Sequence, residues 1–350
     1  MEKNTGKIEK DFFKNFIKKK CGKGKDEIQN GPKFGVDVAV INMPNNQALA
    51  LASDPLSLIP QLGLKESAWL SVQLTANDIA TTGFPPMYGQ FVLNLPSNFS
   101  QQDFQVYWEH IHQFCSDIGL AITGGHTGFV EGQNSTIVGG ATFLTIAPQD
   151  QILTSAMAEP GDHILVTKSC GISSSAILTL SFPETVKNKA GIENYRKACN
   201  SFYDISILKD ALTAVDNENR RYITAMHDVT EGGVLGAIYE MVTASDNGAL
   251  VYDEKLPVDE VQSSVLNTFS LNSRYTLGAG SLIITCKEEG VKRTINQLQK
   301  LDIPCTKVGQ ITKKEQGIKL RREGLISDIV YSKRDPYWEA FYKALKLGWK

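Results

Sequence analysis

The chain has 350 residues, of which 42% are hydrophobic and 21% are charged, and its formal net charge is −2. These values are typical of a globular protein with about two domains. They exclude the basic balance of a nucleic-acid-binding protein and provide no general attraction to an anionic membrane. The charged start and the absence of a long apolar run predict a cytoplasmic protein without a signal peptide or a membrane span. Six scattered cysteines form no C-x-x-C pair, so neither a zinc site nor a disulfide framework is expected.

The first segment, residues 1–30, is rich in lysine. Phe12, Phe13, Phe16 and Ile17 recur in it at helical spacing, which predicts an amphipathic segment whose aromatic face docks on the rest of the protein.

Residues 31–150 predict a first α/β domain. Strands are expected at 36–41 and 49–54, joined by a hairpin turn at Pro44-Asn45-Asn46. Further along the chain we expect helices at 67–82 and 101–118, and strands at 90–95, 121–123 and 136–146.

Residues 158–325 alternate strands and helices again, which predicts a second α/β domain. The expected strands are 163–167, 223–228, 281–285 and 307–311, and the expected helical regions are 176–180, 185–216, 232–241 and 291–300. The tail 333–350 carries an aromatic face and is expected to be a helix. The predicted fold class is therefore mixed α/β with two domains.

Three acids stand in apolar surroundings: Asp37 in a strand, Asp54 at a strand end and Asp78 after Asn77 on a helix. Oxygen ligands of this kind suit Mg²⁺, which a few carboxylates and substrate phosphates usually hold. Acids that converge without partners require a cation. The alternative is that Asp78 only caps or turns a helix while Asn77 bonds to the backbone.

A glycine-rich motif, Gly124-Gly125-His126-Thr127, follows a strand. We interpret it as a turn where backbone N–H groups and the Thr127 hydroxyl could approach phosphate. A glycine turn with a capping threonine is the alternative. Neither a G-x-x-x-x-G-K-[ST] nor a G-x-G-x-x-G pattern is present, so the common nucleotide-binding folds are not indicated.

A polar cluster of His227, Asp228 and Glu231 lies between a strand and a helix, where α/β domains often keep their sites. The alternative gives Thr230 as a helix cap and His227 as a buried histidine with its hydrogen bonds satisfied. Lys168 follows the first strand of the second domain in a similar setting.

Together these motifs resemble the aminoimidazole ribonucleotide (AIR) synthetase superfamily. The resemblance rests on their order: Gly35-Val36-Asp37-Val38-Ala39-Val40, Ala52-Ser53-Asp54-Pro55, Asn77-Asp78, Gly124-Gly125-His126-Thr127, Gly161-Asp162 to Lys168, and His227-Asp228-Val229-Thr230-Glu231-Gly232-Gly233. Within this superfamily, the sequence most resembles the AIR synthase-related proteins that are similar to the hydrogenase maturation factor.

The resemblance implies a two-domain PurM-like fold. N-terminal domains of a homodimer would pair into a β-barrel, and the C-terminal domain would be an α/β sandwich. It also implies ATP as cofactor, with Mg²⁺ held at Asp37, Asp54 and Asp78. Nucleotide contacts would come from Asn77, Gly124, Gly125, His126, Thr127 and Lys168, while His227, Asp228 and Glu231 would face nucleotide or acceptor. The implied reaction phosphorylates or activates an oxygen of a small molecule.

Several departures keep alternatives open. No cysteine follows Cys305, whereas the carbamoyl dehydratase of hydrogenase maturation needs one at its C-terminus. Cys21 resembles the N-terminal cysteine of selenophosphate synthetase, but we interpret it as a surface residue. The first motif has one acid, Asp37, where many members have two. The alternatives are a nucleotide-binding maturation scaffold without turnover, an enzyme like selenophosphate synthetase or thiamine monophosphate kinase, or an α/β module that binds no nucleotide.

Overall fold

The computed structural model of the protein describes residues 6–132, 139–332 and 334–350. Parts of three expected segments, namely 1–5, 136–138 and 333, lie outside the described residues. The chain forms two compact units. The N-terminal unit comprises 26–31 and 38–152, and the C-terminal unit comprises 6–25, 32–37 and the described part of 153–350. Among the described residues, no helix combines the length and the hydropathy needed to cross a membrane.

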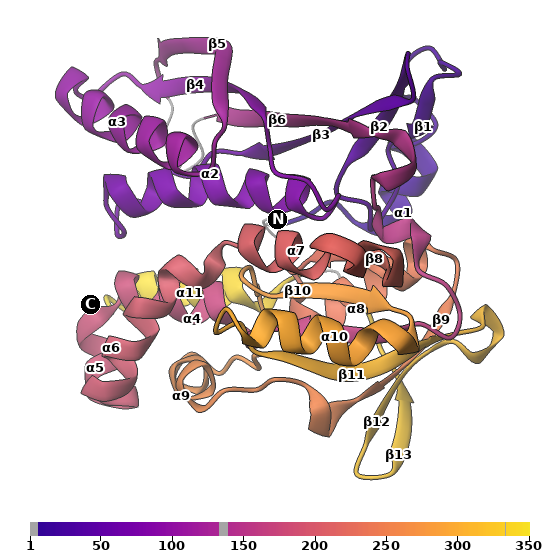
Figure 1. Ribbon diagram of the computed structural model, residues 1–350. Coiled ribbons are helices and arrows are strands. Elements are labelled where there is room, and N and C mark those ends of the chain that lie inside the picture. Colours follow the sequence, from indigo (N-terminus) through magenta and orange to yellow (C-terminus); the bar gives the residue numbers. More distant parts are fainter. Residues whose placement is uncertain (1–5, 133–138, 333) are drawn as a thin grey trace. The chain divides into compact units, whose positions relative to one another are not determined.

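The N-terminal unit is built on a six-stranded sheet in the order β1-β2-β3-β6-β4-β5, open at the edge strands β1 and β5 (Figure 1). All neighbours pair antiparallel except β4 and β5, which are parallel. Two long helices, α2 and α3, pack together and cover one face of the sheet. The elements are β1 (Ile28–Asn30), β2 (Ala39–Met43), β3 (Gln47–Pro55), α2 (Leu64–Ala80), β4 (Tyr88–Pro96), α3 (Gln101–Asp117), β5 (Ala121–Val130) and β6 (Gly139–Pro148).

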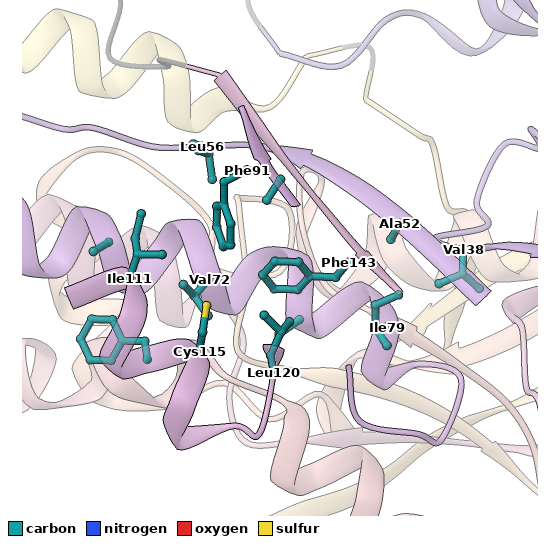
Figure 2. Close-up of a cluster of buried hydrophobic side chains, with 14 of the residues drawn as sticks. Val38, Ala52, Leu56, Val72, Ile79, Phe91, Ile111, Cys115, Leu120 and Phe143 are labelled. Atoms are coloured by element: carbon teal, nitrogen blue, oxygen red, sulfur yellow. The ribbon is translucent and has the colours of Figure 1, made fainter. Parts of the chain in front are cut away.

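Alternation of side chains creates the core of this unit. Along β4 every second residue is buried, so that Phe91 meets the helices while its neighbours point away. Val72 and Ile79 of α2 and Ile111 of α3 pack against this inner face, as Figure 2 shows. The expected hairpin is confirmed: Pro44, Asn45 and Asn46 connect the paired residues Met43 and Gln47, and both asparagines have positive φ, which asparagine tolerates.

The expectation of a turn at Gly124–Thr127 is wrong. These residues continue strand β5 and pair with β4 in parallel, with Gly125 opposite Phe91. The strands approach so closely there that a Cβ on Gly125, at φ +142°, would lie 1.8 Å from the carbonyl oxygen of Phe91. Gly125 therefore serves strand pairing, because only a residue without a side chain fits so close to β4.

The C-terminal unit contains a seven-stranded sheet in the order β13-β12-β9-β11-β7-β10-β8, antiparallel except where β12 pairs with β9. Figure 1 shows α10 in front of this sheet and α8 behind it. The strands are β7 (His163–Thr167), β8 (Ile223–Asp228), β9 (Gly248–Tyr252), β10 (Leu282–Cys286), β11 (Cys305–Thr312), β12 (Ile318–Arg322) and β13 (Leu325–Asp328). The helices are α4 (Ile172–Ser181), α5 (Pro183–Ala190), α6 (Ile192–Asn200), α7 (Leu208–Ala214), α8 (Gly233–Ala244), α9 (Glu260–Thr268), α10 (Glu288–Gln299) and α11 (Pro336–Lys346).

Residues 6–25 of the N-terminal segment belong to the C-terminal unit. The helical part of this segment begins as α1 (Lys10–Phe12) and continues as a π-helical turn over Phe13–Ile17. The expected docking of its aromatic face is not seen: Phe12 and Phe16 stack on each other, about half exposed. Polar contacts of residues 7 and 10 hold this segment to its unit instead.

Candidate functional site

The candidate site lies at the C-terminal end of β8. His227 and Asp228 are its last residues, and both are buried, with 1% and 3% of their surface exposed. Pairing of β8 with β10, in which His227 lies opposite Ile283, fixes their backbone. The loop from Thr230 to Gly232 then leads into α8. The strand-to-helix placement expected for this motif is confirmed.

Asp37 reaches this strand end from residues 32–37. Its Oδ2 lies 2.8 Å from Nδ1 of His227, and Oδ1 of Asp228 lies 3.6 Å from the same nitrogen. The approach depends on Gly35, since a Cβ there, at φ +75°, would lie 2.3 Å from the carbonyl oxygen of Glu240. Only glycine lets the segment pass this close to α8.

Glu240 of α8 closes the other side of the imidazole. Its Oε2 lies 3.3 Å from Nε2 of His227, and its Oε1 accepts a hydrogen bond of 2.6 Å from the Tyr331 hydroxyl. The Glu240 carboxylate is only 4% exposed. Three carboxylates thus surround one buried imidazole: those of Asp37, Asp228 and Glu240.

Electrostatics in this cluster favour a protonated imidazole. Burial would lower the pKa of His227, but Asp37 above all, then Asp228 and Glu240, raise it above its ordinary value. For Asp37, burial raises the pKa to about 6 against the opposing effect of His227. Burial would also raise the pKa of Glu240, but Lys7 and His227 together lower it to about 2.

The same geometry could hold a metal ion. Asp37, His227 and Asp228 each offer one ligand atom, and these atoms lie within 4.8 Å of one another. Despite the short separations, neither ring nitrogen of His227 nor Oδ2 of Asp37 has a partner aligned for a directed hydrogen bond. Buried nitrogen and oxygen atoms that lack a directed hydrogen bond are suited to coordinate a cation.

The Glu231 carboxylate makes hydrogen bonds to residues outside the cluster. Its Oε1 accepts a hydrogen bond of 2.9 Å from the indole Nε1 of Trp338, and its Oε2 accepts one of 2.8 Å from the backbone N–H of Lys7. Glu231 therefore links the N-terminal segment to α11 and stands at the edge of the cluster.

Lys168 follows β7 in a left-handed conformation, with φ +56°. Its Nζ donates to the carbonyl oxygens of Asp204 and Ser206 and pairs with the buried carboxylate of Asp210 at 3.1 Å. With these three oxygen partners the lysine fastens the segment before α7 to the end of β7. A nucleotide contact of Lys168 remains a prediction.

The other predicted residues belong to the N-terminal unit. Asp54 lies near the end of β3, and Asn77 and Asp78 lie on α2, where Asn77 is fully buried. His126 and Thr127 are exposed on the edge strand β5. Their roles toward metal and nucleotide remain predictions.

Glu240, Tyr331 and Lys7 were missed by sequence reasoning. Glu240 offered a signal, since it is the single acid in the apolar run Gly233–Ala244 that forms α8. A charge at a core position of a buried helix requires a partner. Lys7 and Tyr331 offered none, because their proximity arises only from tertiary structure.

The two α/β units and the acidic strand-end site define a two-domain protein of the PurM-like class. The family model described as "AIR synthase related protein, N-terminal domain" matches residues 35–146, and the corresponding C-terminal domain model matches residues 159–320. The chain therefore belongs to the AIR synthase related family.

Relatives of this chain carry different activities. It is 24% identical over 251 residues to a protein of Methanocaldococcus jannaschii named for hydrogenase expression/formation, covering 71% of each chain. It is 24% identical over 340 residues to the thiamine-monophosphate kinase of Buchnera aphidicola subsp. Schizaphis graminum, covering 91% of this chain and 94% of the kinase.

Solved structures share the fold. The hydrogenase maturation protein HypE in complex with ATP matches with a TM-score of 0.69 and 20% identity, covering 86% of this chain and 89% of HypE. The structure described as AaThiL complexed with AMPPCP and TMP matches with a TM-score of 0.70 and 16% identity, covering 92% and 97%.

Proposed function

We propose that the protein is a Mg²⁺- and ATP-dependent enzyme that phosphorylates or activates an oxygen of a small-molecule acceptor. The observation that carries the proposal is the buried cluster of Asp37, His227 and Asp228, in which Oδ2 of Asp37 and both ring nitrogens of His227 lack a directed hydrogen bond and suit a cation. Support for the nucleotide comes from HypE, a relative in fold whose structure contains ATP.

Asp37, Asp54 and Asp78 are the proposed metal ligands. The fit is best at Asp37, where a buried carboxylate oxygen lacks a directed hydrogen bond. When bound, Mg²⁺ would supply charge neutralisation for the phosphates. Asn77, Gly124, Gly125, His126, Thr127 and Lys168 are the proposed nucleotide contacts.

His227, Asp228 and Glu231 are proposed to face the nucleotide or the acceptor. Asp37 and Asp228 orient the His227 imidazole, which must release its extra proton before a ring nitrogen can ligate a cation. Phosphoryl transfer depends mainly on positioning and charge, so no covalent nucleophile is required.

A homodimer is part of the proposal. The face of the N-terminal sheet opposite α2 and α3 exposes apolar side chains on several strands, including Met43, Tyr88, Val92 and Ile146. A contiguous apolar face of this kind favours an interface, and a second copy of the chain would present the same face. We also propose a cytoplasmic location, which suits six free cysteines.

The direct test is calorimetric titration of ATP into the protein with and without Mg²⁺. We expect binding that Mg²⁺ strengthens and that Asp78→Asn weakens, with circular dichroism showing that the variant is folded. No binding to the folded wild-type protein in either condition would rule the proposal out.

A second candidate is a nucleotide-binding scaffold without turnover. The single acid at Asp37, flanked by Val36 and Val38, favours it because fewer metal ligands are available there. Release of ADP and phosphate against a panel of metabolites separates the two functions. Turnover that Asp78→Asn abolishes, in a folded variant, would exclude the scaffold.

A further inference from the structure

The N-terminal strap, defined here as residues 6–11, carries a lysine to the mouth of the carboxylate cluster. Nζ of Lys7 lies 3.7 Å from Oε2 of Glu240 and donates a hydrogen bond of 3.0 Å to Oγ1 of Thr230. The Lys7 side chain is 50% exposed, whereas that of Glu240 is 4% exposed. The ammonium group therefore stands where the buried cluster meets solvent.

Lys7 contributes a positive charge in addition to that of protonated His227. Within the part of the chain that the structure describes, it is the only lysine or arginine in ion-pair distance of Asp37, Asp228 or Glu240. The cluster has three carboxylates and one imidazole, so it stays negative even when His227 is protonated. Its potential attracts one further positive charge.

The strap is held by few contacts. The backbone N–H of Lys7 donates to Glu231, and Nζ of Lys10 donates to the Tyr239 hydroxyl at 3.2 Å while lying over the Phe34 ring. None of residues 6–11 is buried. A cavity of about 240 Å³ lies beneath residues 7–11, with Glu231, Tyr239, Tyr331 and Asp335 among its lining residues. The strap thus forms one wall of a cavity and contributes no buried residue to the core.

We propose that Lys7 is a tethered counter-cation of the Asp37–His227–Asp228 site, and that a divalent cation bound there displaces Lys7 together with the strap. Lys7 pairs with Glu240, which flanks the same imidazole as Asp37 and Asp228, so Lys7 and a bound metal ion would repel each other and the cluster favours one of them at a time. The strap is then an autoinhibitory contact, closed over the site until metal arrives. This inference rests on the proposed function only in assigning a metal ion to Asp37.

Mn²⁺ is the probe of choice, because imidazole and carboxylate together suit a transition metal. Calorimetry would compare the full-length wild type with Lys7→Met, which removes the charge, and Lys7→Arg, which keeps it. Lys14→Met is the matched control, since Lys14 is exposed and its loss changes the net charge equally. We expect Lys7→Met to bind Mn²⁺ about tenfold more tightly than wild type, with Lys7→Arg and Lys14→Met within about twofold of it.

Hydrogen–deuterium exchange of the wild-type protein gives a second readout. The Lys7 amide is protected by Glu231, so release of the strap should speed exchange in residues 6–11 when Mn²⁺ is added. Unchanged Mn²⁺ affinity in Lys7→Met, or bound Mn²⁺ with unchanged exchange, would overturn the inference. Absence of Mn²⁺ binding in every variant would also overturn it. Loss of ATP binding with strap release intact would instead overturn the proposed function alone.

Discussion

Nδ1 of His227 lies 2.8 Å from Oδ2 of Asp37, at the end of β8. β8 is an edge strand of its sheet, and Asp37 comes from a segment that is distant in the sequence. The contact nonetheless organises the cluster, because it fixes the imidazole between Asp37 and Glu240.

Removal of the imidazole should destabilise the C-terminal unit. In His227→Ala, the carboxylates of Asp37, Asp228 and Glu240 lose their buried cation, and breaking a buried ion pair in this way costs about 3–5 kcal/mol. Urea denaturation at pH 7 measures the loss. His112→Ala, at an exposed position of α3, is the control and should change stability by less than about 0.5 kcal/mol. Equal stability of the two variants would contradict the prediction.

Lowering the pH should reduce the free energy of unfolding, partly because Glu240 becomes protonated. Its pKa falls from an ordinary value of 4.5 to about 2 in the folded state, so its contribution is complete above pH 4.5 and is lost as the pH falls toward 2. A shift of that size corresponds to about 3 kcal/mol, as an order of magnitude. His227 has the opposite sign, because its raised pKa stabilises the fold at low pH and loses effect as pH rises.

The measurement is the free energy of unfolding of wild type and Glu240→Gln between pH 7 and pH 2. The gap between the two proteins should narrow as the pH drops below 4.5. A constant gap across that range would show that the Glu240 carboxylate has an ordinary pKa.

Cys21 should be the fast-reacting thiol of the native protein. It is exposed, whereas burial raises the pKa to about 12 for Cys115, Cys170 and Cys305 and to about 11 for Cys286. Titration with a disulfide reagent at pH 8 should give one rapid equivalent, absent in Cys21→Ser. Six equivalents should appear in urea. Rapid labelling that persists in Cys21→Ser would contradict this.

A charge on the outer face of the N-terminal sheet should separate the proposed dimer. Val92 is 42% exposed on β4, so Val92→Lys would place an ammonium inside the apolar interface without disturbing the core. Light scattering coupled to size exclusion should report a dimer for wild type and a monomer for the variant. Val258→Lys, at a similarly exposed valine of the C-terminal unit, should remain dimeric. A monomeric wild type would refute the dimer.

Gly125→Ala should destabilise the N-terminal unit. The new Cβ would lie 1.8 Å from the Phe91 carbonyl oxygen, so β5 must move away from β4. We expect a loss of about 2 kcal/mol or more in thermal or urea unfolding, as for other strained backbone substitutions. Gly24→Ala, where nothing lies within 4 Å of the added Cβ, should behave as wild type. Unaltered stability of Gly125→Ala would show that the strands can separate there at little cost.

Local patterns predicted much of the fold. Strand β7 lies at 163–167 as expected, since four apolar or β-branched residues follow His163 between turn signals and admit few alternatives. The Asn45-Asn46 hairpin was predictable because asparagine tolerates positive φ. The prediction of a turn at Gly124–Thr127 was wrong, because glycines occur where two strands approach closely as well as in turns.

The site was only half predictable. His227 and Asp228 share a motif, and Asp37 lies in another, so each could be noticed from sequence. Nothing local indicates that Asp37 meets His227, since that contact is made by tertiary structure. Lys7 was overlooked for the same reason: it lies among many surface lysines and differs from them only in what it touches.

The C-terminal unit is discontinuous in the chain, because it includes 6–25 and 32–37 as well as the residues after 152. On the ribosome, Lys7 and Asp37 are made before His227 and Glu240, and Tyr331 is made later still. The cluster of carboxylates around His227 can therefore close only after Glu240 has been made. A nascent chain released before that point would carry the strap and Asp37 without the side chains that hold them in the folded unit.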